Sequence, residues 1–214
     1  MQIGILGTGD VGNRIGSKLV SLGHEVKMGS RTIGNPKAAE WVKANGARAS
    51  QGTFSDAAKY GEIVFNCTSG MASIEALKMA GAGNLTGKIL VDVSNPLDFS
   101  KGFPPSLSVC NSDSLAEQIQ RAFPTTKVVK ALNTMGNPVM VNPSLVPGDH
   151  DVFICGNDTQ AKTNVVEILK SFGWQSPIDL GDISAARGLE MILPIWLRLY
   201  GLFQTRNFNF KIAK

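Results

Sequence analysis

Three glycines near the start of the chain form the pattern G-x-G-x-x-G within the segment "GILGTGDVG". The pattern follows a short apolar run and leads into a segment whose apolar residues recur at helical spacing. In that context the glycines permit a tight turn, close backbone approach to a pyrophosphate, and close packing of strand on helix. We therefore predict a dinucleotide-binding loop made of Gly7, Thr8, Gly9, Asp10, Val11 and Gly12.

The segment "VKMGSRTIGNPK" lies where a protein that prefers NAD would carry an acid for the adenosine ribose. No Asp or Glu occurs from Val26 through Ala39, and Gly29 stands near the expected acid position. Ser30 offers a hydroxyl and a backbone N–H, and Arg31 offers a planar fork suited to phosphate. We predict that this pair selects NADP(H) over NAD(H). The alternative is that Arg31 is a solvated loop residue. Lys37 is a further candidate contact.

The remaining reactive side chains show no pattern typical of hydrolytic or metal chemistry. Neither His24 nor His150 has partners at the spacing of a metal site or a catalytic triad. Cys67, Cys110 and Cys155 are dispersed and include no CxxC pair, so we expect no disulfide, no metal site and a cytoplasmic location. Such a scarcity of acids and bases suits hydride transfer, which needs mainly proximity, orientation and exclusion of water.

Apolar runs alternate with helical spacing along most of the chain, which predicts the elements that position this site. We expect strands at 2–6, 25–28, 62–67, 88–93, 127–132 and 151–156, with a weak one at 176–179. Helices are expected at 11–22, 36–45, 72–82, 114–123, 159–172 and 183–203. This order predicts an α/β fold with a doubly wound, mostly parallel Rossmann sheet. We assign residues 1–180 to the NADP-binding domain and 181–214 to a C-terminal helical extension.

The chain end carries an apolar stretch, "LEMILPIWLRLYGLF", which is too short to span a bilayer and contains Glu190, Pro194 and Arg198. We expect it to pack on the body or on a second copy in a homodimer, and not in a membrane. Phe208 and Phe210 alternate with polar residues, which predicts a half-buried terminal strand. The net charge of +4 is scattered along the chain, which favours a small-molecule partner over nucleic acid.

The segments "GILGTGDVG…LGHEVKMGSR", "KVVKALNT" and "FICGND" resemble the NADP reductases that use the deazaflavin coenzyme F420. The same segments are similar to the cytosolic oxidoreductase domain of the six-transmembrane metalloreductases. The resemblance extends over nearly the whole chain. It implies transfer of a hydride between NADPH and a flavin-like ring that stacks near the nicotinamide.

Loops that follow three later strands are expected to surround the nicotinamide, because ligands of open α/β sheets bind at the carboxyl ends of the strands. The resemblance points to the same ends. The candidate residues are Thr68, Ser69, Asn95, Asn133, Thr134 and Met135. The alternative is ordinary loop chemistry, since these residue types are common in turns.

Asn133 stands where the archaeal deazaflavin reductases carry histidine, whereas the metalloreductase domains carry asparagine. This difference favours FMN or FAD over the deazaflavin as the acceptor. Two other functions stay open: an NADP(H)-binding redox sensor without turnover, and a dehydrogenase of a small alcohol, acid or imine. The dehydrogenase would need a Lys, His or Tyr acid in the crevice, and no such residue is evident from the sequence.

Overall fold

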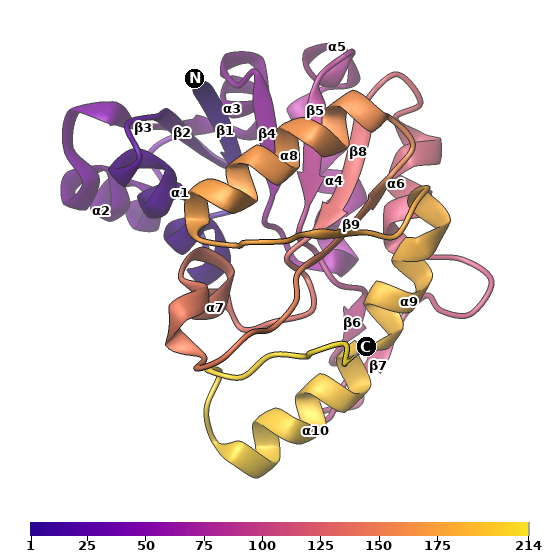
Figure 1. The fold of residues 1–214 in the computed structure, drawn as a ribbon. Coiled ribbons are helices and arrows are strands. Elements are labelled where there is room, and N and C mark those ends of the chain that lie inside the picture. Colours follow the sequence, from indigo (N-terminus) through magenta and orange to yellow (C-terminus); the bar gives the residue numbers. More distant parts are fainter. Residues whose placement is uncertain (214) are drawn as a thin grey trace.

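One eight-stranded sheet runs through the computed structural model, which describes residues 1–213 (Figure 1). Its strands lie in the order β10-β9-β8-β5-β4-β1-β2-β3, and every neighbouring pair is parallel except β8 with β9. This confirms the predicted doubly wound α/β fold. The strands of the sheet are β1 (Gln2–Leu6), β2 (Glu25–Ser30), β3 (Ala49–Thr53), β4 (Ile63–Asn66), β5 (Ile89–Asp92), β8 (Lys127–Ala131), β9 (Phe153–Gly156) and β10 (Ile178–Asp179). A separate antiparallel pair joins β6 (Leu97–Asp98) to β7 (Ser106–Leu107).

Helices cover both faces of the sheet, as a parallel sheet requires. On one face lie α1 (Asp10–Ser21), α2 (Pro36–Asn45), α7 (Asn137–Val141) and α8 (Thr159–Phe172). On the other lie α3 (Phe54–Tyr60), α4 (Gly70–Ala80), α5 (Ala82–Leu85), α6 (Leu115–Ala122) and α9 (Ala186–Met191). The last helix, α10 (Leu193–Phe203), extends away from the body (Figure 1).

Alternating side chains of the strands fill two separate cores. Ile89 and Val91 of β5 join the core beneath α1 and α8, whereas Leu90 between them joins the core beneath α4 and α6. This period of two explains why the strands are apolar throughout: both faces of each strand are buried. The carboxyl ends of β1, β4, β5 and β8 consequently meet at one edge, and the loops after them are held there.

The short elements β6, β7, α5 and α7 were not predicted from the sequence, nor was the adjacent pair β3 and α3. The strand "ASQGT" carries no apolar run because it forms the edge of the sheet, where one side is less buried. Helix α3 follows directly and begins with a capping box in which Thr53 and Asp56 bond each other's backbone. The capping pattern was the available signal for this helix.

The C-terminal region differs from its prediction in two ways. The helix expected at 183–203 is divided after Met191, because Pro194 lacks an N–H and starts α10 in a new direction. The strand predicted around Phe208 and Phe210 was wrong: residues 205–213 form an irregular tail, whose backbone hydrogen-bonds to another described segment only at Asp151. The division at 180/181 stays a prediction, and residue 214 lies outside the described residues. No helix among residues 1–213 has the length and apolarity to cross a membrane.

Candidate active site

The glycine loop has the shape of a phosphate-binding turn. Gly7 adopts φ +121°, and a Cβ there would lie 2.7 Å from Cys67 O. A Cβ on Gly12 would lie 2.2 Å from Gly7 O, so strand and helix approach at backbone distance. Above Gly9, by contrast, no described atom lies within 4 Å of a Cβ position. The helix that follows has no side-chain cap at Gly9, so no capping side chain occupies its first N–H groups. The loop therefore fits a pyrophosphate.

A hollow of about 370 Å³ lies beside this loop, at the end of β2. It is lined by Thr8, Ser30, Arg31, Thr32, Asn35 and Phe54. The Ser30 hydroxyl donates to Thr32 O at 2.5 Å and so shapes the turn, while Arg31 is exposed. Arg31 is the one charged side chain among the described residues that line the hollow. The hollow accordingly suits an anionic group such as a ribose 2′-phosphate.

The sequence predicts Gly29 near the position of the ribose-binding acid of NAD-dependent proteins, but the structure places Ser30 at the end of that strand. Strand β2 runs to Ser30, two residues further than expected, and Gly29 is buried within it. A Cβ on Gly29 would lie 2.8 Å from the Cβ of Ala57 on α3, so a carboxylate cannot be accommodated there. The strand-end side chain that faces the hollow is Ser30.

Beyond the glycine loop, a crevice of about 490 Å³ opens at the carboxyl ends of β4, β5 and β8. Six sequence-predicted residues line it: Val11, Thr68, Ser69, Asn95, Asn133 and Met135. Of the predicted residues outside the glycine loop, two line neither hollow. Thr134 is buried beneath the loop, and Lys37 is exposed in the first turn of α2. Asp10 lies on the exposed start of α1, beside the loop.

Asn133 and Asn95 form a reciprocal pair that fixes both amides. Asn95 Nδ2 donates to Asn133 O at 2.9 Å, and Asn133 Nδ2 donates to Asn95 Oδ1 at 2.9 Å. The second N–H of Asn133 donates to Leu189 O at 2.8 Å, at the end of α9. Both donors of Asn133 are thereby used, and its Oδ1 is buried without a hydrogen-bond partner among the described residues. Asn133 can therefore only accept a hydrogen bond from a ligand.

A buried ionic network supports the floor of the crevice. Lys130 Nζ lies 2.8 Å from Asp92 Oδ2 and 2.9 Å from Glu190 Oε1, and all three side chains are inaccessible to solvent. Asp92 also accepts from Asn66 Nδ2 at 2.8 Å, and Asn66 Oδ1 accepts from the Thr68 hydroxyl at 2.7 Å. Glu190 accepts from the N–H groups of Leu115 and Ala116 at the start of α6. The network joins β4, β5, β8, α6 and α9 below the site.

Burial and charge keep two groups near the crevice in one protonation state around neutrality. Burial and the neighbouring charge of Asp92 raise the pKa of the Cys67 thiol, which disfavours a thiolate. Burial opposes the charge of Lys130, but the carboxylates of Asp92 and Glu190 outweigh it and raise the pKa of its ammonium. Lys130 is thus a buried cation, and it is absent from the lining of the crevice. It is not the acid that a dehydrogenase would need.

An aromatic and apolar wall of the crevice was missed by sequence reasoning. It comprises Phe99 and Phe103 from the β6–β7 connection, Met140 from α7, and Leu193, Trp196, Leu197 and Tyr200 from α10. Trp196 and Tyr200 stack with 5.7 Å between ring centroids, as the spacing of four residues on a helix allows. That spacing was the available signal. Such a wall suits a flat, apolar ring.

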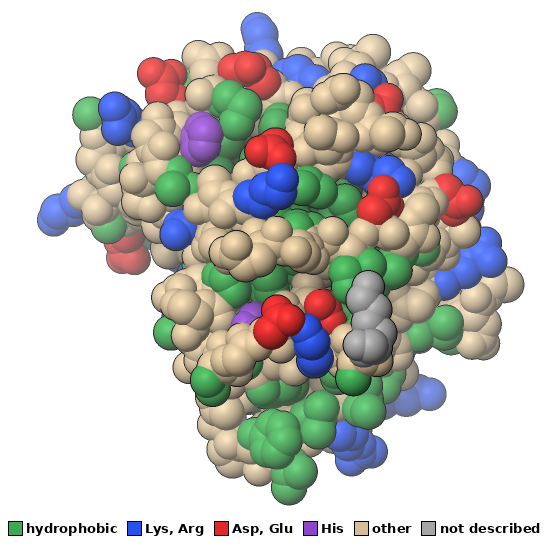
Figure 2. All heavy atoms as spheres, viewed as in Figure 1, with side chains coloured by type: hydrophobic (Ala, Val, Ile, Leu, Met, Phe, Trp, Pro, Cys, Tyr) green, Lys and Arg blue, Asp and Glu red, His purple; other side chains and the backbone are tan. Residues whose placement is uncertain are grey.

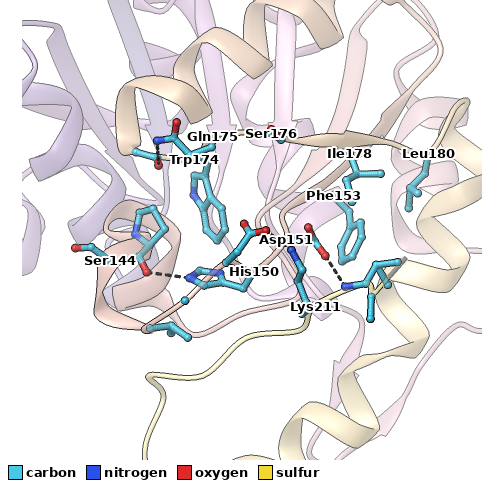
Figure 3. Close-up of a pocket in the computed structure, with 17 residues that line it drawn as sticks. Ser144, His150, Asp151, Phe153, Trp174, Gln175, Ser176, Ile178, Leu180 and Lys211 are labelled. Atoms are coloured by element: carbon cyan, nitrogen blue, oxygen red, sulfur yellow. Dashed lines mark hydrogen bonds and ion pairs between the residues drawn. The ribbon is translucent and has the colours of Figure 1, made fainter.

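A larger cavity, about 890 Å³, lies elsewhere, between the 143–151 loop, β10 and the C-terminal tail (Figure 3). Its titratable side chains are engaged with neighbours. His150 Nε2 lies 3.0 Å from Pro143 O, and His150 Nδ1 lies 2.9 Å from Asn209 Nδ2. Lys211 pairs with Asp149. The cavity contains no residue of the glycine loop or of the strand-end loops, so we place the active site in the smaller crevice.

Comparisons with known proteins indicate the family of this chain. The family described as NADP oxidoreductase, coenzyme F420-dependent, matches residues 2–96, which include the glycine loop and Arg31. The F420-dependent NADP reductase of Methanocaldococcus jannaschii is 29% identical over 100% of this chain and 98% of its own length. Metalloreductase STEAP3 of Rattus norvegicus is 32% identical over 97% of this chain, which spans only 41% of that relative.

A solved structure is similar over its entire length. The crystal structure of a candidate F420-dependent NADP reductase from Arthrobacter sp. FB24 matches with a TM-score of 0.96 and 52% sequence identity, covering 100% of both chains. Identity at that level over a full chain shows common family membership as well as a common fold. The chain therefore belongs to the family of coenzyme F420-dependent NADP oxidoreductases.

Proposed function

We propose that this oxidoreductase transfers a hydride between NADP(H) and a flavin-like tricyclic ring, with the deazaflavin F420 as the first acceptor to test. The nicotinamide would supply or take the hydride, and the second ring would be its partner. The observation that carries the proposal is that three surfaces meet the same glycine loop: the open space above Gly9, the hollow at Arg31, which Thr8 lines, and the aromatic crevice, which Val11 lines. Together they accommodate an NADP molecule and a second ring.

Residues at different positions along the site would bind different parts of the two ligands. The first N–H groups of α1 hold the pyrophosphate, and Arg31 holds the 2′-phosphate. Asn133 Oδ1 accepts from an N–H of the nicotinamide carboxamide or of the acceptor ring, because its own donors are committed to Asn95 and Leu189. Trp196 and Tyr200 exclude water and orient the acceptor ring.

FMN or FAD is the second candidate acceptor, and Asn133 is the observation that favours it. An amide cannot become a cation, and this one has no donor left for an anionic reduced deazaflavin. A reduced flavin, however, carries an N–H at ring position 5, where a deazaflavin has carbon, and Asn133 Oδ1 could accept a hydrogen bond from it. The preference for FMN or FAD over F420 stays a prediction.

The test follows NADPH oxidation while F420, FMN and FAD are offered in turn, with the unmodified protein and with Asn133→Ala. We expect turnover with at least one ring. The variant should lose turnover number more than NADPH affinity, because it loosens ring placement and leaves phosphate anchoring intact. Tight NADPH binding without oxidation by any ring would instead indicate a redox sensor. Unchanged kinetics of Asn133→Ala would remove that residue from the site.

Tyr200 allows the dehydrogenase alternative to be tested, since it is the phenol that lines the crevice. Reduction of a small carbonyl or imine needs a proton donor, whereas hydride transfer between two rings needs only an ordered wall. Tyr200→Phe should therefore retain most of the turnover with the ring acceptor. A loss of about a hundredfold or more would favour acid catalysis by Tyr200.

We also propose that α10 packs against a second copy of the chain. Ile195, Leu202 and Phe203 are 54%, 72% and 51% exposed, and hydrophobic side chains gather over this helix at the lower end of Figure 2. An exposed apolar surface at the end of a helix is typical of an oligomer contact. Light scattering at micromolar concentrations should give a dimer mass, and Leu202→Glu should give a monomer. A monomeric unmodified protein would contradict the proposal.

A further inference from the structure

The tail that follows α10 reaches the crevice, which Arg206 lines. We call residues 205–209 the strap. In Figure 1 the yellow segment after α10 runs past α7 before it turns toward the C-terminus. Gly136, the residue before α7, makes room for it: a Cβ there would lie 2.4 Å from Arg206 O. The strap thus packs at backbone distance on the loop that also carries Asn133.

Contacts of the residues that follow Arg206 hold the strap in place. Phe208 stacks on Trp196 of α10, with ring centroids 5.2 Å apart. Asn209 Nδ2 donates to Asp151 O at 2.8 Å. Further along, the N–H of Ile212 donates to Asp151 Oδ2 at 2.6 Å (Figure 3). The position of Arg206 is therefore set by the fold, although its side chain is about half exposed.

The guanidinium of Arg206 lies beside the glycine loop. Arg206 Nη1 is 3.8 Å from Asp10 Oδ2, and Arg206 Cζ is 5.8 Å from the centroid of the Tyr200 ring. Asp10 is the first residue of α1, where the predicted pyrophosphate site begins. The distance to Asp10 is too long for a hydrogen bond, and within residues 1–213 no other group accepts one from this guanidinium. Its donors are not committed.

The pyrophosphate of a bound dinucleotide would attract the Arg206 guanidinium more strongly than Asp10 does. A pyrophosphate carries two negative charges and presents paired oxygens that match the planar fork of a guanidinium. Asp10 is 81% exposed and so holds the guanidinium only weakly. Its carboxylate would also repel a bound pyrophosphate.

We propose that Arg206 is a pyrophosphate-binding residue, which leaves Asp10 and pairs with NADP(H) from the side opposite the helix N-terminus. The proposal rests on the proposed function, in that NADP(H) occupies the glycine loop. It extends that function to the strap, which would then contribute to cofactor affinity as well as cover the crevice. Arg31 and Arg206 would have different tasks, the first reading the 2′-phosphate and the second binding a group common to both nucleotides.

The test measures dissociation constants of NADPH, NADH and adenosine 2′-monophosphate by fluorescence or calorimetry. Arg206→Ala should weaken NADPH and NADH by a similar factor, about tenfold or more. Binding of adenosine 2′-monophosphate, which has no pyrophosphate, should stay within about twofold. Arg198→Ala is the matched control, since Arg198 is an exposed arginine of α10 that does not line the crevice.

Asp10→Asn separates ligand binding from a purely structural ion pair. If Arg206 binds the pyrophosphate, removal of the competing carboxylate should tighten NADPH, so the two variants act with opposite signs. If the Arg206–Asp10 pair only fixes the strap, both variants should weaken NADPH alike, which would overturn the proposal. Dissociation constants of Arg206→Ala within twofold of the unmodified protein would also overturn it. An unmodified protein that binds neither nucleotide would refute the proposed function itself.

Discussion

The two halves of the candidate active site are built on different physical principles. The half beside α1 and β2 consists of backbone N–H groups, glycines and exposed arginines. The half that faces β5, β8 and α9 rests on the buried charges of Asp92, Lys130 and Glu190. Gly9 and Arg31 of the first half face open space, so they can change with little cost to the fold, whereas the second half couples the site to stability. Substitutions in the two halves should therefore separate binding from folding.

Lys130→Met should have the largest effect, and that effect is on stability. It would leave the carboxylates of Asp92 and Glu190 buried without their cation, which typically costs about 3–5 kcal/mol. Urea denaturation followed by circular dichroism would measure the free energy of unfolding. Lys127→Met is the control on the same strand, since Lys127 pairs with Asp158 at the surface and should matter far less. Equal effects of the two substitutions would refute the distinction between the halves.

Gly9→Val should have the opposite profile, with a loss of binding and little loss of stability. The backbone of Gly9 has φ −79°, and a side chain there meets open space in the protein alone. The branched side chain would occupy the pyrophosphate position and weaken both nucleotides by more than about a hundredfold. Calorimetric titration and a thermal melt would measure the two quantities. Normal NADPH binding by the folded variant would place the ligand elsewhere.

Arg31→Ala should change selectivity between the nucleotides. The unmodified protein should bind NADPH at least about tenfold more tightly than NADH, because hydrogen bonds to a charged group are strong. The variant should lose most of that preference and bind NADH almost unchanged. Dissociation constants for both nucleotides give the ratio directly. Equal affinities in the unmodified protein would show that Arg31 is a solvated loop residue.

The smallest expected effect is that of pH on hydride transfer. Burial and the Asp92 charge raise the pKa of Cys67, so its thiol stays protonated near neutrality. Burial lowers the pKa of Lys130, but the charges of Asp92 and Glu190 outweigh burial and raise it. The stabilising charge of Lys130 is therefore fully present below its unfolded pKa, about 10.4, and is lost only as pH rises through the folded value. Single-turnover rates should vary less than about twofold from pH 6 to 8. A steep change in that range would reveal a titrating group in the site.

The same division explains what the sequence could reveal. The glycine loop and Arg31 were predictable because each is a contiguous segment at the end of an apolar strand. The network around Lys130 was not, since its partners lie 38 residues away at Asp92 and beyond, and "KVVKAL" reads as an ordinary strand. The strap was wrongly predicted to be a strand. Alternation of Phe208 with polar residues is found in a hydrogen-bonded β-strand, but an irregular tail whose Phe208 packs on Trp196 shows the same pattern.

The most direct test of hydride transfer between two bound rings is a single turnover with NADPH deuterated at the nicotinamide C4, in the presence of F420, FMN or FAD. The account predicts that NADPH oxidation and acceptor reduction occur with one common rate, slowed by deuterium. With F420 the label should be recovered on the reduced ring, where carbon holds it against exchange with water. Hydride transfer between two bound rings would be contradicted if none of the three rings oxidised NADPH. It would also be contradicted if the reduced F420 carried no deuterium.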